Sequence, residues 1–90
     1  MDEAAIRRDW AQRGFSCEVW SDPPGRAWEN FVHDVDELLM LVAGELEVAL
    51  PDRTWRPRPG EEVWIPAGVR HSVRNVGSTP NRWLYGYRRR

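Results

Sequence analysis

The sequence predicts an all-β protein, an antiparallel barrel or sandwich preceded by one short helix. Segments of alternating polar and apolar residues recur along the chain, and Gly and Pro clusters separate them at a spacing of about 8 to 12 residues. Of the 90 residues, 41% are hydrophobic, which suits one packed core. We therefore expect a single domain over residues 1–90, with the helix in 1–14, the barrel in 15–87 and a basic tail in 88–90.

The helix is expected near the N-terminus. Residues 2–13 begin with acidic side chains and continue with arginines, an order that complements the helix dipole. Ile6 and Trp10 are four residues apart and so share one helix face, and Gly14 follows where the helix should end. In residues 15–20 polar and apolar side chains alternate, which predicts the first strand.

The next part of the chain has two interpretations. Residues 28–33 fit a second strand after the turn cluster at 22–25. The apolar residues of 30–43 also fit one face of a helix, and periodicity alone does not separate the two. Later segments are clearer, and strands are predicted at residues 46–50, 63–65, 71–76 and 82–87.

The composition excludes several classes of function. Thirteen arginines against fourteen acidic residues give a net charge of -1, so no overall field attracts nucleic acid or an anionic membrane. There is no lysine for a Schiff base or a phosphate-binding loop. Cys17 is the only cysteine, which excludes an intramolecular disulfide and a cysteine-cluster zinc site. With no signal-peptide pattern or long apolar run, we expect a cytoplasmic protein that binds neither nucleic acid nor membranes.

Both histidines lie in segments with a characteristic spacing. Beginning at Gly60, the chain reads G-x5-P-x-G-x2-H-x3-N, with Pro66, Gly68, His71 and Asn75 at the remaining fixed positions. This segment resembles the second conserved motif of the cupin family at every fixed position. The proline and glycine suit a tight turn that reverses the chain before His71.

An earlier segment resembles the first cupin motif, G-x5-H-x-H-x3,4-E-x6-G. His33, Glu37 and Gly44 match its later part, whereas Phe31 stands where the first histidine of the family would be. The two motifs cover roughly half of the chain. Together they imply the antiparallel cupin barrel, also described as a double-stranded β-helix or jelly roll. A phenyl ring cannot coordinate a cation, so the family's four-ligand metal site is reduced here to three ligands.

His33 and Glu37 cannot reach one ion along a single straight strand. Two ligands of one ion lie within about 4.5 Å of each other, because each is about 2 Å from it. Four residues of extended chain span about 13 Å. Either a bend at residues 34–36 or a helix would bring the two side chains together. The resemblance implies the bend, with His33 ending one strand, Glu37 opening the next and Gly44 closing the following hairpin.

The resemblance thus implies a divalent-metal centre made by His33, Glu37 and His71. Two imidazoles and a carboxylate suit Fe, Mn, Ni, Co or Zn, and the order of intrinsic affinities does not choose among them. Phe31 would crowd one side of the ion and make the pocket more apolar. Asn75 is on the same side of its strand as His71, where it would hydrogen-bond in the interior or lie near the site.

Glu29 and the six tryptophans are further candidates for the pocket. Glu29 lies two residues before Phe31 and so shares its face, which makes it a candidate substitute ligand or acid–base group. The tryptophans are expected mainly in the core, with some at the mouth of a pocket.

The resemblance implies a small-molecule ligand bound at a metal. Cupins include dioxygenases, isomerases and decarboxylases, and nothing in the sequence chooses among these reactions. The alternative is a non-catalytic small-molecule or metal-binding cupin, including one with a degenerate metal site in which the histidines are ordinary half-buried residues. We also expect a homodimer, because a barrel of this size leaves strand edges and apolar surface for a partner to cover.

Overall fold

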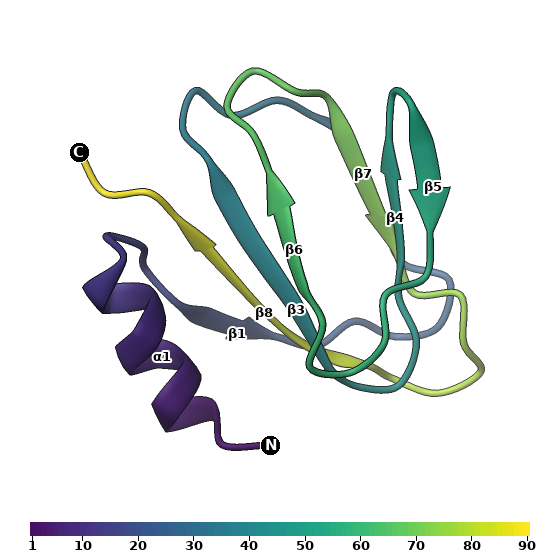
Figure 1. Ribbon diagram of the computed structural model, residues 1–90. Coiled ribbons are helices and arrows are strands. Elements are labelled where there is room, and N and C mark those ends of the chain that lie inside the picture. The colour runs from purple at the N-terminus through teal and green to yellow at the C-terminus, as the bar shows by residue number, and fades with distance from the viewer.

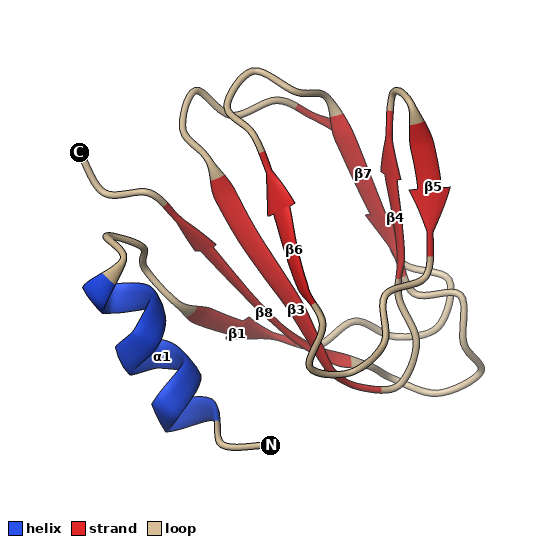
Figure 2. Ribbon diagram, viewed as in Figure 1, coloured by secondary structure: helices blue, strands red, loops and turns tan.

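The structure, a computed structural model, describes residues 1–90 and contains one helix and eight strands (Figure 1). In Figure 2 the strands account for most of the regular structure, which confirms the all-β prediction. The elements, in chain order, are α1 (Glu3–Gln12), β1 (Glu18–Trp20), β2 (Ala27–Phe31), β3 (Glu37–Ala43), β4 (Glu47–Leu50), β5 (Arg53–Trp55), β6 (Glu62–Ile65), β7 (His71–Arg74) and β8 (Arg82–Tyr87).

The strands form two four-stranded antiparallel sheets that face each other (Figure 1). One sheet has the order β1-β8-β3-β6 and the other the order β2-β7-β4-β5. No ladder joins the two sheets into a closed hydrogen-bonded barrel. The arrangement is the two-sheet jelly roll that the resemblance to the cupin motifs implies, and it agrees with the sandwich or barrel that the spacing of strands and turns predicts.

The segment with two interpretations is a strand. β3 pairs with β6 on one side and with β8 on the other, so it lies in the middle of its sheet. Leu38 and Met40 pack on one face of that sheet, and Leu39 and Leu41 pack on the other. A strand that is buried on both faces reads as a continuous apolar run. This double burial explains why its sequence also fitted a helix.

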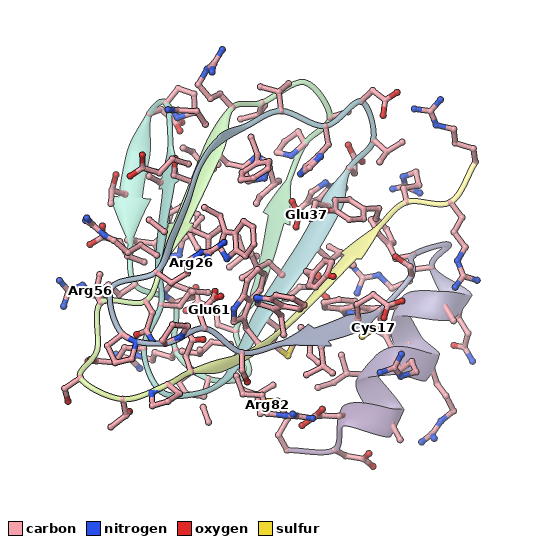
Figure 3. The ribbon with its side chains drawn as sticks, turned by 180° about the vertical axis from the view of Figure 1, so that it is seen from behind. Cys17, Arg26, Glu37, Arg56, Glu61 and Arg82 are labelled. Atoms are coloured by element: carbon pink, nitrogen blue, oxygen red, sulfur yellow. The ribbon has the colours of Figure 1, made fainter.

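The hydrophobic core consists of two clusters on opposite faces of the β1-β8-β3-β6 sheet. The helix α1 covers the outer face, and Figure 1 shows it lying alongside that sheet. Trp10 is the fully buried anchor of the helix. Arg82 pairs with Glu3 in the first helical turn, and its side chain lies beside the helix in Figure 3. The cluster between the sheets contains Leu39, Leu41, Leu46, Val48, Val63, Ile65, Val73 and Trp83.

The first strand and the C-terminal arginines differ from what the sequence predicts. β1 begins at Glu18, and Phe15 contributes only an isolated bridge to Arg88. The three terminal arginines do not form a free tail, because the amide of Arg88 donates to the Asp36 carbonyl and that of Arg89 to the Gly14 carbonyl. The structure contains no helix with the length and apolar character that crossing a membrane requires.

Candidate metal centre

The connection between β2 and β3 brings His33 next to Glu37. β2 ends two residues before His33, the chain bends at 34–35, and Glu37 is the first residue of β3. The turn after β6 braces this bend: the Gly68 amide donates to the His33 carbonyl at 2.8 Å, and the Ala67 amide donates to Asp36 Oδ1 at 2.7 Å. The bend between the two side chains is therefore held from outside the segment.

The same turn positions the second histidine. The Val69 amide donates to the Pro66 carbonyl at 3.2 Å, and Gly68 has a φ of +79°, which suits the third position of a type II turn. A residue with a side chain would be strained at that φ. The turn leads into β7, whose first residue is the buried His71.

The structure brings His33, Glu37 and His71 together between the two sheets. Figure 3 shows Glu37 projecting from β3 toward the interior. Its Oε1 atom lies 3.1 Å from His71 Nε2 and 3.7 Å from His33 Nε2. One candidate ligand atom from each of the three residues lies within 4.8 Å of the other two. Three side chains from different parts of the chain can therefore reach a single ion.

The tautomer of His71 follows from its backbone contact. His71 Nδ1 lies 3.1 Å from the Val69 carbonyl, which can only accept, so Nδ1 carries a hydrogen and donates it. In the neutral ring Nε2 then has a free lone pair, and this lone pair faces the Glu37 carboxylate. Glu37 Oε1 is buried without a hydrogen-bond partner. Two lone-pair atoms at 3.1 Å repel each other unless a cation, either a proton or a metal ion, lies between them.

The groups around His71 favour its protonated form. Burial is the largest single influence and favours the neutral ring, but the Glu37 carboxylate and the Val69 carbonyl together outweigh it and raise the pKa of His71 above its usual range. The site therefore attracts positive charge. Two imidazoles and a carboxylate with one unpaired buried oxygen, that of Glu37, fit a divalent metal. The Val69 carbonyl orients the ring of His71, as hydrogen-bond acceptors commonly do for metal-binding histidines.

A cavity of about 210 Å³ opens beside these three residues. It is smaller than the pockets of about 300–1,000 Å³ that hold drug-sized molecules, so it has room only for a small molecule. Its walls are mostly aromatic. The lining residues are Trp20, Trp28, Phe31, His33, Glu37, His71, Val73, Trp83, Tyr85 and Tyr87.

Phe31 forms the wall next to the histidines. Its ring is stacked on that of His33, with centroids 6.0 Å apart and an interplanar angle of 20°. It is thus an apolar neighbour of the candidate ligands, at the position where the family motif has a histidine.

Glu29 does not line the cavity. The register of β2 against β7 shifts between Trp28 and Phe31, and Asn30 within this bulge has a φ of +60°. The bulge breaks the alternation of side chains, so Trp28 and Phe31, three residues apart, both face the cavity. Glu29 is exposed. The expectation that Glu29 shares the face of Phe31 assumed a regular strand.

Asn75 takes the interior hydrogen-bonding position rather than one at the cavity. Its side chain is 1% exposed, donates to the carbonyls of Asp22 and Thr79, and accepts from the Gly77 amide. β7 ends at Arg74, one residue earlier, so strand alternation no longer directs the side chain at this position. Asn75 therefore organises the loop after β7.

Two tyrosines of β8, Tyr85 and Tyr87, are part of the site although sequence patterns did not point to them, and Trp83 was expected there only as one of the six tryptophans. Trp83, Tyr85 and Tyr87 alternate along β8 and all line the cavity. The Tyr87 hydroxyl lies 3.5 Å from His33 Nε2. Burial, followed by the nearby Glu37 and Tyr85, raises the pKa of Tyr87 to about 12. The alternation of three aromatic residues was a usable signal, but only the pairing of β8 with β3 places them at this site.

Comparison with known proteins agrees with this architecture. Among curated proteins, the polyketide synthase CurC of Streptomyces cyaneus is 32% identical over 75 residues, which cover 83% of this chain and 49% of that protein. The chain thus spans about half the length of this relative.

Solved structures with the same fold include three at or above 25% identity. The cupin 2 domain-containing protein of Halorhodospira halophila has a TM-score of 0.77 at 25% identity, over 83% of this chain and 52% of its own. TT1209 of Thermus thermophilus has a TM-score of 0.74 at 26% identity, over 84% and 74%. The DMSP lyase DddQ of Ruegeria pomeroyi has a TM-score of 0.74 at 26% identity, over 83% and 38%. The family described as "Cupin domain" matches residues 18–87, and the chain belongs to this family.

Proposed function

We propose that this protein is a small metal-dependent cupin that acts on a small organic molecule in the aromatic cavity. The observation that carries the proposal is the contact between His71 Nε2 and Glu37 Oε1, two lone-pair atoms 3.1 Å apart in a buried site. His33 Nε2 adds a third donor atom within reach. A group of unpaired donors directed at one point is a site for a cation.

His33, Glu37 and His71 are the residues that would hold the ion. When bound, a divalent ion with open positions polarises an oxygen of the ligand or activates dioxygen. The Val69 carbonyl keeps His71 Nε2 directed at the site. The Tyr87 hydroxyl lies near His33 and is placed to donate a hydrogen bond to a ligand oxygen.

The walls of the cavity indicate the class of ligand. Seven of the ten lining residues are hydrophobic, and none is an arginine. Such walls favour a flat, mainly apolar molecule that meets the ion through an oxygen atom. The names of CurC, a polyketide synthase, and of DddQ, a lyase, support an enzymatic role for a barrel of this kind.

Binding without catalysis is the second candidate function. Apart from His33, Glu37 and His71, the only ionisable side chains that line the cavity are Tyr85 and Tyr87. If the first three hold the ion, few groups remain to transfer a proton during a reaction. This shortage favours a protein that holds its ligand without converting it.

Elemental analysis of protein purified without a histidine tag tests the metal-dependent proposal. We expect about one divalent ion per chain, and we expect added Co²⁺ to produce the visible absorption bands of a protein-bound ion. The His71→Ala protein, prepared in the same way, is the matched control and should lack both. A parent protein that carries no metal and gives no cobalt bands would refute the proposal in favour of a degenerate site.

A further inference from the structure

Three tryptophan side chains converge on one buried carboxylate. Asp22, in the turn between β1 and β2, is only 3% exposed. Its Oδ1 accepts the indole hydrogen of Trp20 at 2.9 Å, and its Oδ2 accepts those of Trp28 at 2.9 Å and Trp83 at 3.3 Å. No basic side chain forms an ion pair with Asp22, so neutral N–H groups alone compensate its charge.

The carboxylate connects both sheets at the cavity. Trp20 belongs to β1 and Trp83 to β8, in one sheet, while Trp28 belongs to β2 in the other. All three line the cavity. A carboxylate that accepts from three rings on separate strands restricts how each ring can rotate. The contact therefore acts on the wall of the cavity as well as on the packing of the sheets.

Asp22 is itself held in place by the backbone. Its amide donates to Asn81 Oδ1 at 3.0 Å, and its carbonyl accepts from the Asn81 amide and from Asn75 Nδ2, both at 3.1 Å. These bonds give Asn75 an indirect part in the site. Because these hydrogen bonds hold the amide and the carbonyl of Asp22, its carboxylate keeps a fixed position relative to the indole rings.

A row of aromatic contacts extends from these indole rings to the candidate metal ligand His33. Trp20 and Trp28 meet edge to face, with centroids 6.2 Å apart. The ring of Trp28 lies next to that of Phe31, with centroids 6.1 Å apart. The ring of Phe31 in turn stacks on that of His33, with centroids 6.0 Å apart. Trp20 is 45% exposed and Phe31 39% exposed, although they are large aromatic side chains next to a cavity. Aromatic surface left open in this way is available to a ligand.

We propose that Asp22 is a positioning residue that fixes Trp20, Trp28 and Trp83 so that the cavity accepts a flat conjugated ring bearing an oxygen donor. The part of the proposal that concerns the ligand rests on the function proposed above. The anchoring of the three indoles does not depend on it, because it involves only residues of this chain.

Nuclear magnetic resonance of the indole N–H groups tests the anchor. The six tryptophans should each contribute one indole N–H signal, which single Trp→Phe substitutions assign. We expect the nearly isosteric Asp22→Asn to move the signals of Trp20, Trp28 and Trp83 and to leave those of Trp10, Trp55 and Trp64 in place. The matched control is Glu62→Gln, which should move only the signal of Trp10, because Trp10 Nε1 donates to Glu62 Oε1 at 3.2 Å.

Two results of this measurement would overturn the anchor. If Asp22→Asn moves all six signals, Asp22 acts on the whole fold and not on these three rings. If it moves none of the three, the contacts do not exist in solution. Should Asp22→Asn fail to fold, Trp20→Phe removes one donor from a half-exposed ring and should move the signals of Trp28 and Trp83, which share the same carboxylate. Unmoved signals in that variant would also overturn the anchor.

Calorimetry with two matched probes tests the ligand class. 2-Naphthol is flat and carries one oxygen, whereas decahydro-2-naphthol has the same skeleton without flat rings. We expect the Zn²⁺-loaded parent to prefer 2-naphthol by about tenfold, the size of one or two aromatic contacts. Asp22→Asn should lose most of this preference while its affinity for Zn²⁺ stays unchanged.

The outcomes separate the two proposals. A parent that binds Zn²⁺ but does not distinguish the probes overturns the ligand class and leaves the metal site standing. An Asp22→Asn protein that keeps the full preference overturns the positioning role. A parent that does not bind Zn²⁺ contradicts the proposed function, and the indole signals then decide the anchor alone.

Discussion

Phe31 on β2 is paired with His71 on β7, and the centroids of their two rings are 6.4 Å apart. The position at which the family motif has another histidine is therefore directly beside a candidate metal ligand. The loss of the fourth ligand can therefore be tested with one substitution, because Phe31→His would restore the missing imidazole.

Phe31→His is expected to tighten metal binding. The new imidazole would lie beside His33 and His71 and supply a fourth ligand, so the dissociation constant for Zn²⁺ or Co²⁺ should fall by about tenfold or more. Calorimetric titration measures this, with Phe31→Leu as the control for the loss of the ring. If the parent binds no metal while Phe31→His binds tightly, the natural site is degenerate.

His71→Ala is expected to abolish metal binding. The two ligands left, His33 and Glu37, come from one bent segment and would leave the ion largely hydrated and weakly held. The same titration measures the loss. Arg70→Ala is a suitable control, since Arg70 is the exposed neighbour of His71. Equal affinities in the parent and both variants would mean that the ion binds elsewhere.

Glu62→Gln is expected to destabilise the fold at neutral pH but much less in acid. The hydrogen bond from Arg13 holds the pKa of Glu62 below its usual value of 4.5, so the ionised form stabilises the folded state. This contribution is fully present above about pH 4.5 and is lost as the pH falls through the lowered pKa.

Denaturant unfolding at several pH values measures the effect of Glu62→Gln. Both partners are partly exposed, so we expect a loss of only about 1 kcal/mol near pH 7. Glu18→Gln, at an exposed site on β1, should change little at any pH. A difference between the parent and Glu62→Gln that does not shrink in acid would contradict this mechanism.

Gly86→Ala is expected to destabilise the protein by about 2 kcal/mol or more. A Cβ atom at this position would lie 1.8 Å from the backbone oxygen of Ser16 and 3.1 Å from the ring of Trp10, so the strand β8 and the segment before β1 would have to separate. Gly77→Ala is the control, because its closest contact is the flexible end of Glu45. Similar free energies of unfolding for the two variants would contradict the close approach at Gly86.

A homodimer remains our expectation for the protein in solution. The outer strands β1, β6, β2 and β5 each leave one edge unpaired, and Trp64 on β6 is 55% exposed. Covering such edges and apolar surface stabilises a small β protein. Light scattering should report twice the mass of the chain at micromolar concentration, and a monomer alone at that concentration would contradict the expectation.

Local patterns in the sequence were sufficient to predict the turn before His71, whereas the bend between His33 and Glu37 followed only from the resemblance to the cupin motifs. Pro66 and Gly68 impose their conformations without help from distant residues, so the turn before His71 could be predicted from residue type alone. If His33 and Glu37 are to share an ion, the distance between them excludes a straight strand, but spacing alone left both a bend and a helix open. The turn depends on residues within a few positions of each other, whereas the bend is braced by the amides of Ala67 and Gly68, more than 30 positions away.

Only the tertiary structure decided which other side chains reach the cavity. The bulge at Asn30 excludes Glu29 and admits Trp28, and it depends on how β2 pairs with β7. Asp22 accepts from Trp83, which lies 61 positions further along the chain. Sequence patterns report the periodicity of one segment, whereas a bulge or a shared buried carboxylate depends on which segments pack together, and long-range packing determines that.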